Sequence, residues 1–507
     1  MTASVAARDH REDSASPGPS PSGSLRIRTD RLLGRTYWAL PALLTLLLGV
    51  RGSSRPELWR DELATWSAAT RSTGEIFDML KHVDAVSGAY YLLMHFWIGV
   101  FGDSPAVFRL PTALALAGAA AFTTLAARRL FDTRTALFAG VLFATIPSIS
   151  RFAQEARAYG FVLLAVSAAT WLLLRALERP TLVRWLPYAV AVAAAGLFHM
   201  VSLLFLSGHA VVVLLRWRRS RDRRLLLRFP VAVAVGLVPV IPLVLLGRRQ
   251  VGRQISWLHE PWLQTFHDYW HNLFGSPLIS YCFLLLVAIP AGWSRRRMPA
   301  FEIGVVAALP IGLSWLASHG SSVYFFERYQ LYTLPAWSIL AAAGLASIRP
   351  RLVGLLGLAT VVAIGIPDQQ KLRSGASHEY TDGRGAARII ADGYKSGDAF
   401  APLLGSQSYM MLDLEIGYYL PDDVHLKDPL VARTAVQRGD LFSTPCKDPV
   451  VCLAGTDRIW VVTMGHSSDL LESFPAVEAA ALRSSFTETE VKQVRGLTVA
   501  LLERRAG

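Results

Sequence analysis

Long apolar segments recur along the first two thirds of the chain and constrain its fold more than any other feature. They run to about 17–22 residues each between Thr36 and Pro367, and a helix of that length spans the roughly 30 Å hydrocarbon core of a bilayer. The chain is 52% hydrophobic and only 18% charged, whereas soluble proteins average about 25% charged residues. The sequence therefore predicts a polytopic α-helical membrane protein, surrounded by membrane lipids.

The net charge of +13 comes mostly from arginines in short loops between apolar segments. Such loops set membrane orientation, because positive charge stays on the cytoplasmic side. A nucleic-acid partner is therefore not expected. Placing each arginine-rich loop in the cytoplasm gives a consistent alternation of about eleven spans. The prediction is a multi-pass plasma-membrane protein with a cytoplasmic N-terminus and an external C-terminus.

Changes in composition divide the chain into three parts. Residues 1–35 are rich in Ser, Pro, Gly and charge, so we expect a disordered cytoplasmic N-terminus. Residues 36–367 form the membrane domain, whose first external loop covers about 52–105. Within this loop, residues 90–101 are apolar and aromatic but too short for a span, which predicts a helix at the outer interface. Residues 368–507 form a small external domain.

The external domain alternates helix and strand patterns, which is typical of an α/β fold. The expected order is helix 384–393, strand 399–404, helix 409–419, strand 458–464, helix 471–486 and period-two runs at 491–494 and 497–502. Cys446 and Cys452 lie six residues apart in it, and an external compartment permits a disulfide between them.

The predicted orientation places the unusual polar residues on one face of the membrane. They are Asp61, Glu62, His82 and Asp84 in the first external loop; Glu155, Arg157 and Tyr159 in the second; Arg248, Arg249 and Arg253 in the fourth; and Arg328 and Tyr329 in the fifth. Acids, bases and aromatic side chains that converge on one side would suit an active site at the membrane surface.

Asp61 and Glu62 are the candidate catalytic carboxylates. Helical spacing puts Trp59, Leu63 and Trp66 on one face, which can rest on the membrane, and Asp61 on the opposite face toward an aqueous cleft. The alternative is that Asp61 caps the helix. The two roles are compatible.

His82 and Asp84 offer an imidazole and a further acid in the same loop. With Asp61 or Glu62 they could bind a divalent cation through oxygen ligands. The alternative is a solvated loop end.

The external arginines are candidates for binding a phosphate group, which a guanidinium can grip with two hydrogen bonds. For Arg248, Arg249 and Arg253 the alternative is contact with anionic lipid headgroups. For Arg328 the alternative is an intramolecular ion pair. Glu155 and Arg157 could pair with each other or line the same cleft.

Seven short segments, in this order, resemble the GT-C superfamily of membrane glycosyltransferases, in the branch of protein O-mannosyltransferases and the aminoarabinose transferase of lipid A. They are WRDE at 59–62, the interfacial segment at 90–97, 101–102, 109–111, 127–131, QEARAY at 154–159 and 328–329. The resemblance covers roughly residues 36–350. It does not cover the external domain.

The resemblance implies a sugar donor on a polyprenyl phosphate and an acceptor hydroxyl on a glycan, lipid or protein. It also implies an acidic general base in the first external loop, a position that matches Asp61. Relatives often have His/Lys-Pro-Pro-Leu before the interfacial helix, whereas this chain has Asp84 and small residues there. The leaving phosphate could be stabilised by arginines, with Arg328, Arg248, Arg249 and Arg253 as candidates. A metal is then optional, so no cofactor is expected.

Two other functions fit a polytopic protein with an external domain. A transporter or flippase of a lipid-linked or envelope substrate should carry ionisable residues at mid-membrane and an internal repeat. A binding or sensing protein would use the external domain as its working part. The polar residues gather at one face instead, which favours an inverting transferase with Asp61 as general base.

Overall fold

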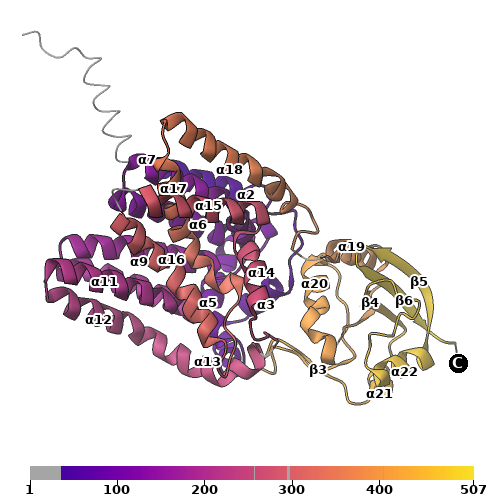
Figure 1. Ribbon diagram of the computed structural model, residues 1–507. Helices are drawn as coiled ribbons and strands as arrows, with labels where there is room; N and C mark the ends of the chain where they lie inside the picture. The colour runs from indigo at the N-terminus through magenta and orange to yellow at the C-terminus, as the bar shows by residue number, and fades with distance from the viewer. Residues whose placement is uncertain (1–35, 256, 294–296, 379, 404, 507) are drawn as a thin grey trace, which may run out of the picture.

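The computed structural model describes residues 36–506 apart from 256, 294–296, 379 and 404. The expected disordered segment 1–35 lies outside the described residues. The molecule has two parts, a large helical bundle and a smaller domain containing a sheet, which packs against one end of the bundle (Figure 1).

The bundle is built from the apolar segments. Its helices are α2 (Ala39–Val50), α6 (Pro105–Leu130), α7 (Thr133–Thr145), α8 (Pro147–Ala153), α9 (Tyr159–Glu178), α10 (Leu182–Phe198), α11 (Phe205–Ser220), α12 (Arg224–Leu237), α13 (Ile241–Gln254), α14 (Leu263–Phe274), α15 (Pro277–Trp293), α16 (Arg297–Ala317), α17 (Leu334–Ser347) and α18 (Arg351–Lys371). Among the described residues, six helices are long and apolar enough to cross a membrane, or up to eight if each of two bent pairs is one span. The count of eleven stays a prediction.

The two bent pairs meet each other. α7 and α8 bend by 61° at Pro147, and α14 and α15 bend by 97° just before Pro277; proline suits the first turn of a new helix because it lacks an N–H. At the contact, the hydroxyl of Ser148 donates to the carbonyl of Leu273 at 2.7 Å. Gly275 has φ +70°, and a Cβ there would lie 2.8 Å from the nitrogen of Ser148.

The segment predicted as the first external loop folds into α3 (Arg60–Ala69), α4 (Thr73–His82), the 3-10 turn η1 (Ala85–Ser87) and α5 (Gly88–Phe101). The expected helix over 90–101 is therefore present as α5. The apolar face of α3 was expected to rest on the membrane. Instead, Leu63 is buried in a cluster with Leu58 and Met94 of the same loop and with Phe108 and Met411 from outside it. The apolar face of α3 is therefore covered by protein.

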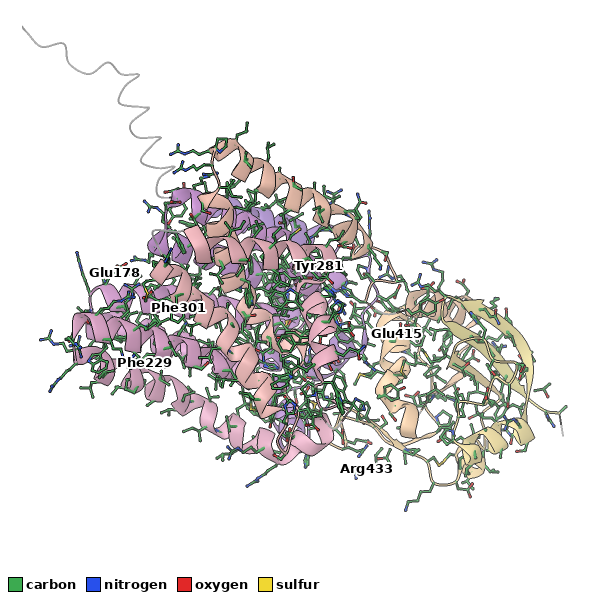
Figure 2. All side chains as sticks on the ribbon, viewed as in Figure 1. Glu178, Phe229, Tyr281, Phe301, Glu415 and Arg433 are labelled. Atoms are coloured by element: carbon green, nitrogen blue, oxygen red, sulfur yellow. A yellow bond between two sulfur atoms is a disulfide. The ribbon has the colours of Figure 1, made fainter. Side chains whose placement is uncertain are left out.

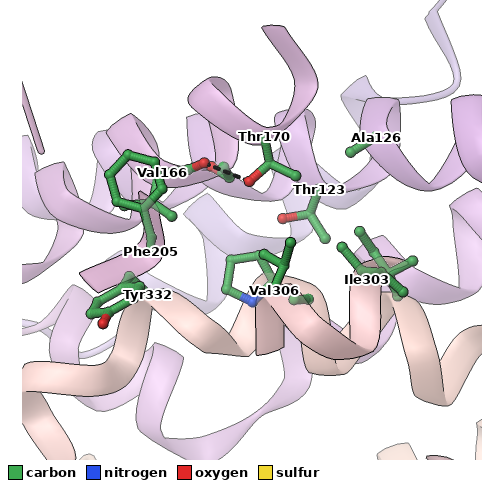
Figure 3. Close-up of a pocket in the computed structure, with 12 residues that line it drawn as sticks. Thr123, Ala126, Val166, Thr170, Phe205, Ile303, Val306 and Tyr332 are labelled. Carbon is green, nitrogen blue, oxygen red and sulfur yellow. Dashed lines mark hydrogen bonds between the residues drawn. The ribbon is translucent and has the colours of Figure 1, made fainter. Parts of the chain in front are cut away.

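The interior of the bundle is closely packed. The void in Figure 3, which Thr123, Phe205, Val306 and Tyr332 help to line, has a volume of about 10 Å³. A volume of that size holds about one water molecule, so this void is too small for a substrate.

The smaller domain confirms the predicted α/β character. Its helices are α19 (Gly383–Gly393), α20 (Leu412–Tyr419), α21 (Pro449–Cys452) and α22 (Ala476–Ser485), and its strands are β1 (Ala399–Ala401), β2 (Val431–Arg433), β3 (Thr444–Pro445), β4 (Arg458–Met464), β5 (Phe486–Val494) and β6 (Leu497–Arg504). The main sheet has the order β1-β4-β6-β5, in which β1 runs parallel to β4 and the other pairs are antiparallel.

Three sequence predictions in this domain can be checked. The disulfide between Cys446 and Cys452 is present, which confirms that prediction. The strand expected over 399–404 ends at Ala401, because Pro402 cannot donate to a ladder. The helix expected over 471–486 begins only at Ala476, after Pro475, and Phe486 already starts β5.

Candidate active site

Asp61 lies in the first turn of α3, where a carboxylate interacts favourably with the helix dipole. The cap position itself belongs to Trp59, so Asp61 is not the N-cap that the alternative interpretation expected. One oxygen of Asp61, Oδ2, accepts a hydrogen bond from Nη1 of Arg328 at 2.9 Å. The Asp61 side chain keeps 29% of its surface exposed, so a reactant can reach it.

Arg328 comes from η4 (Glu327–Thr333), the 3-10 segment that leads into α17. Its guanidinium lies 5.3 Å from the ring centre of Trp59, 6.0 Å from Trp257 and 4.6 Å from Phe326. Aromatic faces attract a cation at such distances. The expected ion pair of Arg328 therefore exists, with Asp61 as its partner, and aromatic rings hold the guanidinium in place.

Arg328 and Trp59 line a cavity of about 460 Å³, together with Arg151, Glu155 and Glu327. Its floor is the contact between the two bent helix pairs, because residues from both bends line it. Ligand sites for small molecules have volumes of roughly 300–1,000 Å³. The cavity is therefore large enough for a sugar phosphate.

Glu155 is the unusual acid of this cavity. It is 1% exposed, and neither carboxylate oxygen has a hydrogen-bond partner among the described residues. Burial, reinforced by the negative charges of Glu62 and Asp61, raises the pKa of Glu155 to about 7, although Arg151 and Arg328 oppose the shift. Such a carboxyl can accept or donate a hydrogen bond at neutral pH.

The QEARAY segment and Tyr329 meet around Asp61. Nη1 of Arg157 donates to the main-chain oxygen of Asp61 at 3.3 Å. Tyr159 begins α9, and its ring lies 5.9 Å from that of His199, which in turn lies 4.7 Å from the ring of Tyr329. The structure therefore brings the second and fifth predicted loops to the first, as the orientation argument required.

Glu62 has a different environment from its neighbour. Its side chain is fully buried, and Arg109 donates to both oxygens, at 2.8 Å from Nε and 2.6 Å from Nη2. The N–H of Ala156 adds a third hydrogen bond at 2.8 Å. Burial raises the pKa of Glu62, but the charge and hydrogen bonds of Arg109 outweigh it and lower the pKa to about 2. This geometry gives Glu62 a structural role in place of the expected catalytic one.

Asp84 lies near the site but is fully engaged. It has a left-handed backbone with φ +52°, and its carboxylate accepts hydrogen bonds from Tyr91, from Ser87 at 3.1 Å and from Gln254 at 3.3 Å. Burial raises its pKa, against the opposing charge of Arg157. Asp84 is therefore an anchor between its loop and α13 in this structure.

His82 is not brought to Asp61. It ends α4, and its ring nitrogen Nδ1 lies 2.9 Å from the main-chain oxygen of Asp78 on the same helix. Within the part of the chain that the structure describes, no group of three or more His, Cys, Asp or Glu side chains could hold a metal ion. The metal site considered around His82 and Asp84 therefore has no support from the geometry.

Arg248 and Arg249 are exposed on α13, and the described contacts link neither of them to Asp61 or Arg328. The side chain of Arg253 lies outside the described residues. The buried face of α13 instead carries Gln250, which accepts from the N–H of Ala85 at 2.9 Å. The phosphate-binding role expected for Arg248 and Arg249 is therefore not favoured by their placement.

Sequence reasoning missed Arg151 and His271 of the cavity, and it gave Arg109 no role of its own. Arg151 lies in α8 and Glu155 just past the end of that helix, so helical periodicity does not place the two side chains together. Arg109 appeared only within a family segment. Nothing in the sequence signals its pairing with Glu62, which lies 47 positions away.

Comparisons with known proteins agree with this architecture. A family model described as dolichyl-phosphate-mannose-protein mannosyltransferase matches residues 88–245. A search of curated proteins gives no match. Crystal structures of ArnT from Cupriavidus metallidurans, in the apo state and bound to undecaprenyl phosphate, are similar with a TM-score of 0.62 and 16% identity, over 92% of this chain and 98% of that chain.

The oligosaccharyltransferase of Archaeoglobus fulgidus is also similar, with a TM-score of 0.48 and 10% identity over 90% of this chain and 72% of that one. The likeness to ArnT covers both the bundle and the smaller domain and establishes a shared fold. The family model matches within the bundle, from α5 to α13. The family model therefore covers residues 88–245 of the chain, and the likeness to ArnT, at 16% identity, shows a shared fold.

Proposed function

We propose that the protein moves a sugar from a polyprenyl-phosphate carrier to an acceptor hydroxyl, with inversion at the anomeric carbon and with Asp61 as general base. The observation that carries the proposal is the pair of Asp61 and Arg328, an accessible acid held 2.9 Å from a cation that lines the 460 Å³ cavity. The ArnT structure that is described as bound to undecaprenyl phosphate supports the class of donor.

Asp61 would take the proton of the acceptor. A hydroxyl loses its proton far above pH 7, so it attacks only if a base accepts the proton as the new bond forms. The acceptor oxygen then bonds to the anomeric carbon, and the proton passes to the Asp61 carboxylate. The bond from that carbon to the phosphate oxygen breaks, and its electron pair leaves with the lipid phosphate. One displacement of this kind inverts the anomeric configuration.

Arg328 would stabilise the leaving group. The departing phosphate gains negative charge, and a planar guanidinium can donate two parallel hydrogen bonds to it. Arg151 adds a second cation to the same cavity. A phosphate bound to Arg328 would compete with Asp61 for the guanidinium, so donor binding would release the carboxylate for its role as base.

Glu155 would bind the sugar. Its two oxygens lack partners among the described residues, and leaving such a buried group unsatisfied costs about 1–3 kcal/mol or more. Sugar hydroxyls are hydrogen-bond donors of the kind that it lacks. We therefore expect the sugar ring to lie between Glu155 and the Asp61–Arg328 pair.

The test uses the purified protein in lipid nanodiscs with a panel of polyprenyl-phosphate sugars and candidate acceptors. Free lipid phosphate and transferred sugar are both measured. Asp61→Asn should abolish transfer and still bind the donor. Asp78→Asn is the matched control. Asp78 is an exposed acid of the same loop, and its described ion pair is with Lys81.

Wild-type transfer rates in the Asp61→Asn variant would overturn the mechanism. Movement of the intact donor from one leaflet of a liposome to the other, without release of lipid phosphate, would favour the transporter instead.

A further inference from the structure

Residues 53–58 form the approach segment, which leads directly into α3 and therefore sets where Asp61 lies. We propose that the C-terminal domain is a positioning element of the active site, which holds this approach segment through Tyr419 and Arg384. The inference goes beyond the proposed function and rests on it only for the role of Asp61.

The bundle holds one side of the approach segment. Arg109 of α6 donates to three of its main-chain oxygens: from Nη1 to Ser53 at 2.6 Å and to Pro56 at 3.0 Å, and from Nη2 to Glu57 at 3.0 Å. The same guanidinium binds Glu62. Arg109 therefore ties the segment and the first turn of α3 to the membrane part.

The C-terminal domain holds the other side. The N–H of Leu58 donates to the hydroxyl of Tyr419 at 2.9 Å. The N–H of Arg384 donates to the Glu57 carboxylate at 3.3 Å, and its guanidinium donates to the oxygen of Ser54 at 3.3 Å. Tyr419 ends α20 and Arg384 lies in the first turn of α19, so two helices of the domain reach the same segment.

Figure 2 labels Glu415 on α20, the helix of the smaller domain that lies beside the bundle. The Arg384 guanidinium also lies 5.1 Å from the ring centre of Tyr419, so the two side chains support each other. Figure 1 shows α20 and α19 beside the end of the bundle that carries α3.

On the side of the approach segment, the groups bound by Tyr419 and by the N–H of Arg384 belong to buried residues, whereas the contact from Arg384 to Ser54 is exposed. Leu58 is fully buried and Glu57 is 4% exposed. Without Tyr419, the N–H of Leu58 would lose the partner it has in this structure, and a buried donor without a partner is unfavourable. We therefore expect the approach segment to shift or loosen when the hydroxyl is removed.

A fourth contact comes from the linker between α18 and α19. Nδ1 of His378 lies 3.6 Å from Oε2 of Glu62, and both side chains are almost completely buried. The contacts of the domain and its linker therefore bracket Asp61 in the sequence, at Ser54, Glu57 and Leu58 before it and at Glu62 after it.

The test compares Tyr419→Phe with Tyr418→Phe. Both variants lose one hydroxyl from the same helix at the same interface, but Tyr418 donates to the main-chain oxygen of Asp103 at 2.7 Å and has no described hydrogen bond to the approach segment. Hydrogen exchange of the peptide covering residues 53–62 is measured in the full-length protein, together with kcat and KM for sugar transfer.

We expect Tyr419→Phe to speed exchange in residues 53–62 about fivefold or more, the effect of one net hydrogen bond. It should also lower kcat by about tenfold or more, since small displacements of a catalytic group have effects of that size. KM for the lipid donor should change little. Tyr418→Phe should change neither the exchange of this peptide nor kcat by more than about twofold.

Arg384→Ala and Arg388→Ala form a second pair, for use if Tyr419→Phe does not fold. Arg384 contacts the approach segment, whereas Arg388 is exposed one turn further along α19. Arg384→Ala should reproduce the faster exchange and the lower kcat, and Arg384→Lys should restore part of both.

Equal effects of the two tyrosine variants, or unchanged exchange in residues 53–62 for both Tyr419→Phe and Arg384→Ala, would overturn the positioning role. Absence of sugar transfer in the wild-type protein would count against the proposed function alone, because the exchange measurement needs no substrate.

Discussion

Glu62 and Arg109 form a two-bonded ion pair that is sealed from solvent directly behind Asp61, with N–O distances of 2.8 and 2.6 Å. Two carboxylates that are neighbours in the sequence thus have opposite environments. The partly exposed one, Asp61, pairs with Arg328 beside the cavity, and the buried one, Glu62, joins α3 to α6. This division explains why only one of the two acids is available for proton transfer.

The first prediction concerns this pair. Glu62→Gln leaves the Arg109 charge without its buried partner, and breaking such a pair costs about 3–5 kcal/mol. We expect a lower melting temperature and poor recovery from detergent extraction. The double variant Glu62→Gln with Arg109→Met should lose less stability than the sum of the two single variants, because the two side chains interact directly. It still loses the Arg109 hydrogen bonds to Ser53, Pro56 and Glu57, so full recovery is not expected. Losses that simply add would contradict the prediction.

The same pair has a defined pH dependence. The pKa of Glu62, ordinarily about 4.3, falls to about 2 in the folded protein. The unfolded chain therefore binds the proton more readily. The stabilisation is therefore fully present above about pH 4.5 and is lost as the pH falls toward 2. Thermal unfolding measured between pH 5 and 3 should show a smaller pH dependence for Glu62→Gln than for the wild-type protein.

The arrangement of loops could be predicted because of orientation. Once positively charged loops are placed on one side, Asp61, Glu155 and Arg328 must lie on the other, and the structure brings all three to one cavity or its edge. The role of Glu62 could not be predicted, because it depends on a partner from the next apolar segment. Periodicity shows which face a residue occupies and does not show which partner it meets.

Arg248 and Arg249 illustrate the same limit. The predicted orientation places both arginines outside, and this placement suggested phosphate binding. However, α13 turns Gln250 and Gln254 toward the first external loop and leaves these two arginines exposed. Which face of a helix packs inward was not visible from charge alone.

The second prediction tests Arg328 against these arginines. Arg328→Lys keeps the charge but loses the planar fork that can bind a phosphate with two hydrogen bonds. We expect kcat for release of lipid phosphate to fall by about 10²-fold, in line with the loss of one preorganised donor. The control variants Arg248→Lys and Arg249→Lys should stay within about twofold of wild type. A large loss in these two would restore them as phosphate ligands.

The third prediction uses Glu155, whose pKa is raised to about 7. A raised pKa means that the unfolded chain releases this proton first, at about pH 4.3, so ionisation weakens the folded state as the pH rises from about 4.3 through 7. The melting temperature of the wild-type protein should therefore fall between pH 5 and 8 relative to that of Glu155→Gln. Parallel curves would show that Glu155 does not titrate in this range.

Glu155→Gln should also affect the donor. A carboxylate accepts hydrogen bonds at both of its oxygens, whereas the glutamine amide accepts only at its single oxygen. A hydrogen bond to a charged group contributes about 1.5–3 kcal/mol. We expect kcat/KM for the sugar donor to fall by about tenfold or more, while binding of the polyprenyl phosphate without a sugar stays close to wild type. An equal loss of affinity for both lipids would place Glu155 at the phosphate instead.

The last prediction concerns the floor of the cavity. Gly275 has φ +70°, and an added Cβ would lie 2.8 Å from the nitrogen of Ser148 on the opposite bend. Gly275→Ala should therefore push the two bent helix pairs apart and strain the left-handed backbone. We expect a melting temperature several degrees lower and a higher KM for the lipid donor. Gly252→Ala is the control, because a Cβ at Gly252 on α13 would meet nothing within 4 Å. If the two alanine variants behave alike in both measurements, the contact between the bends does not shape the cavity.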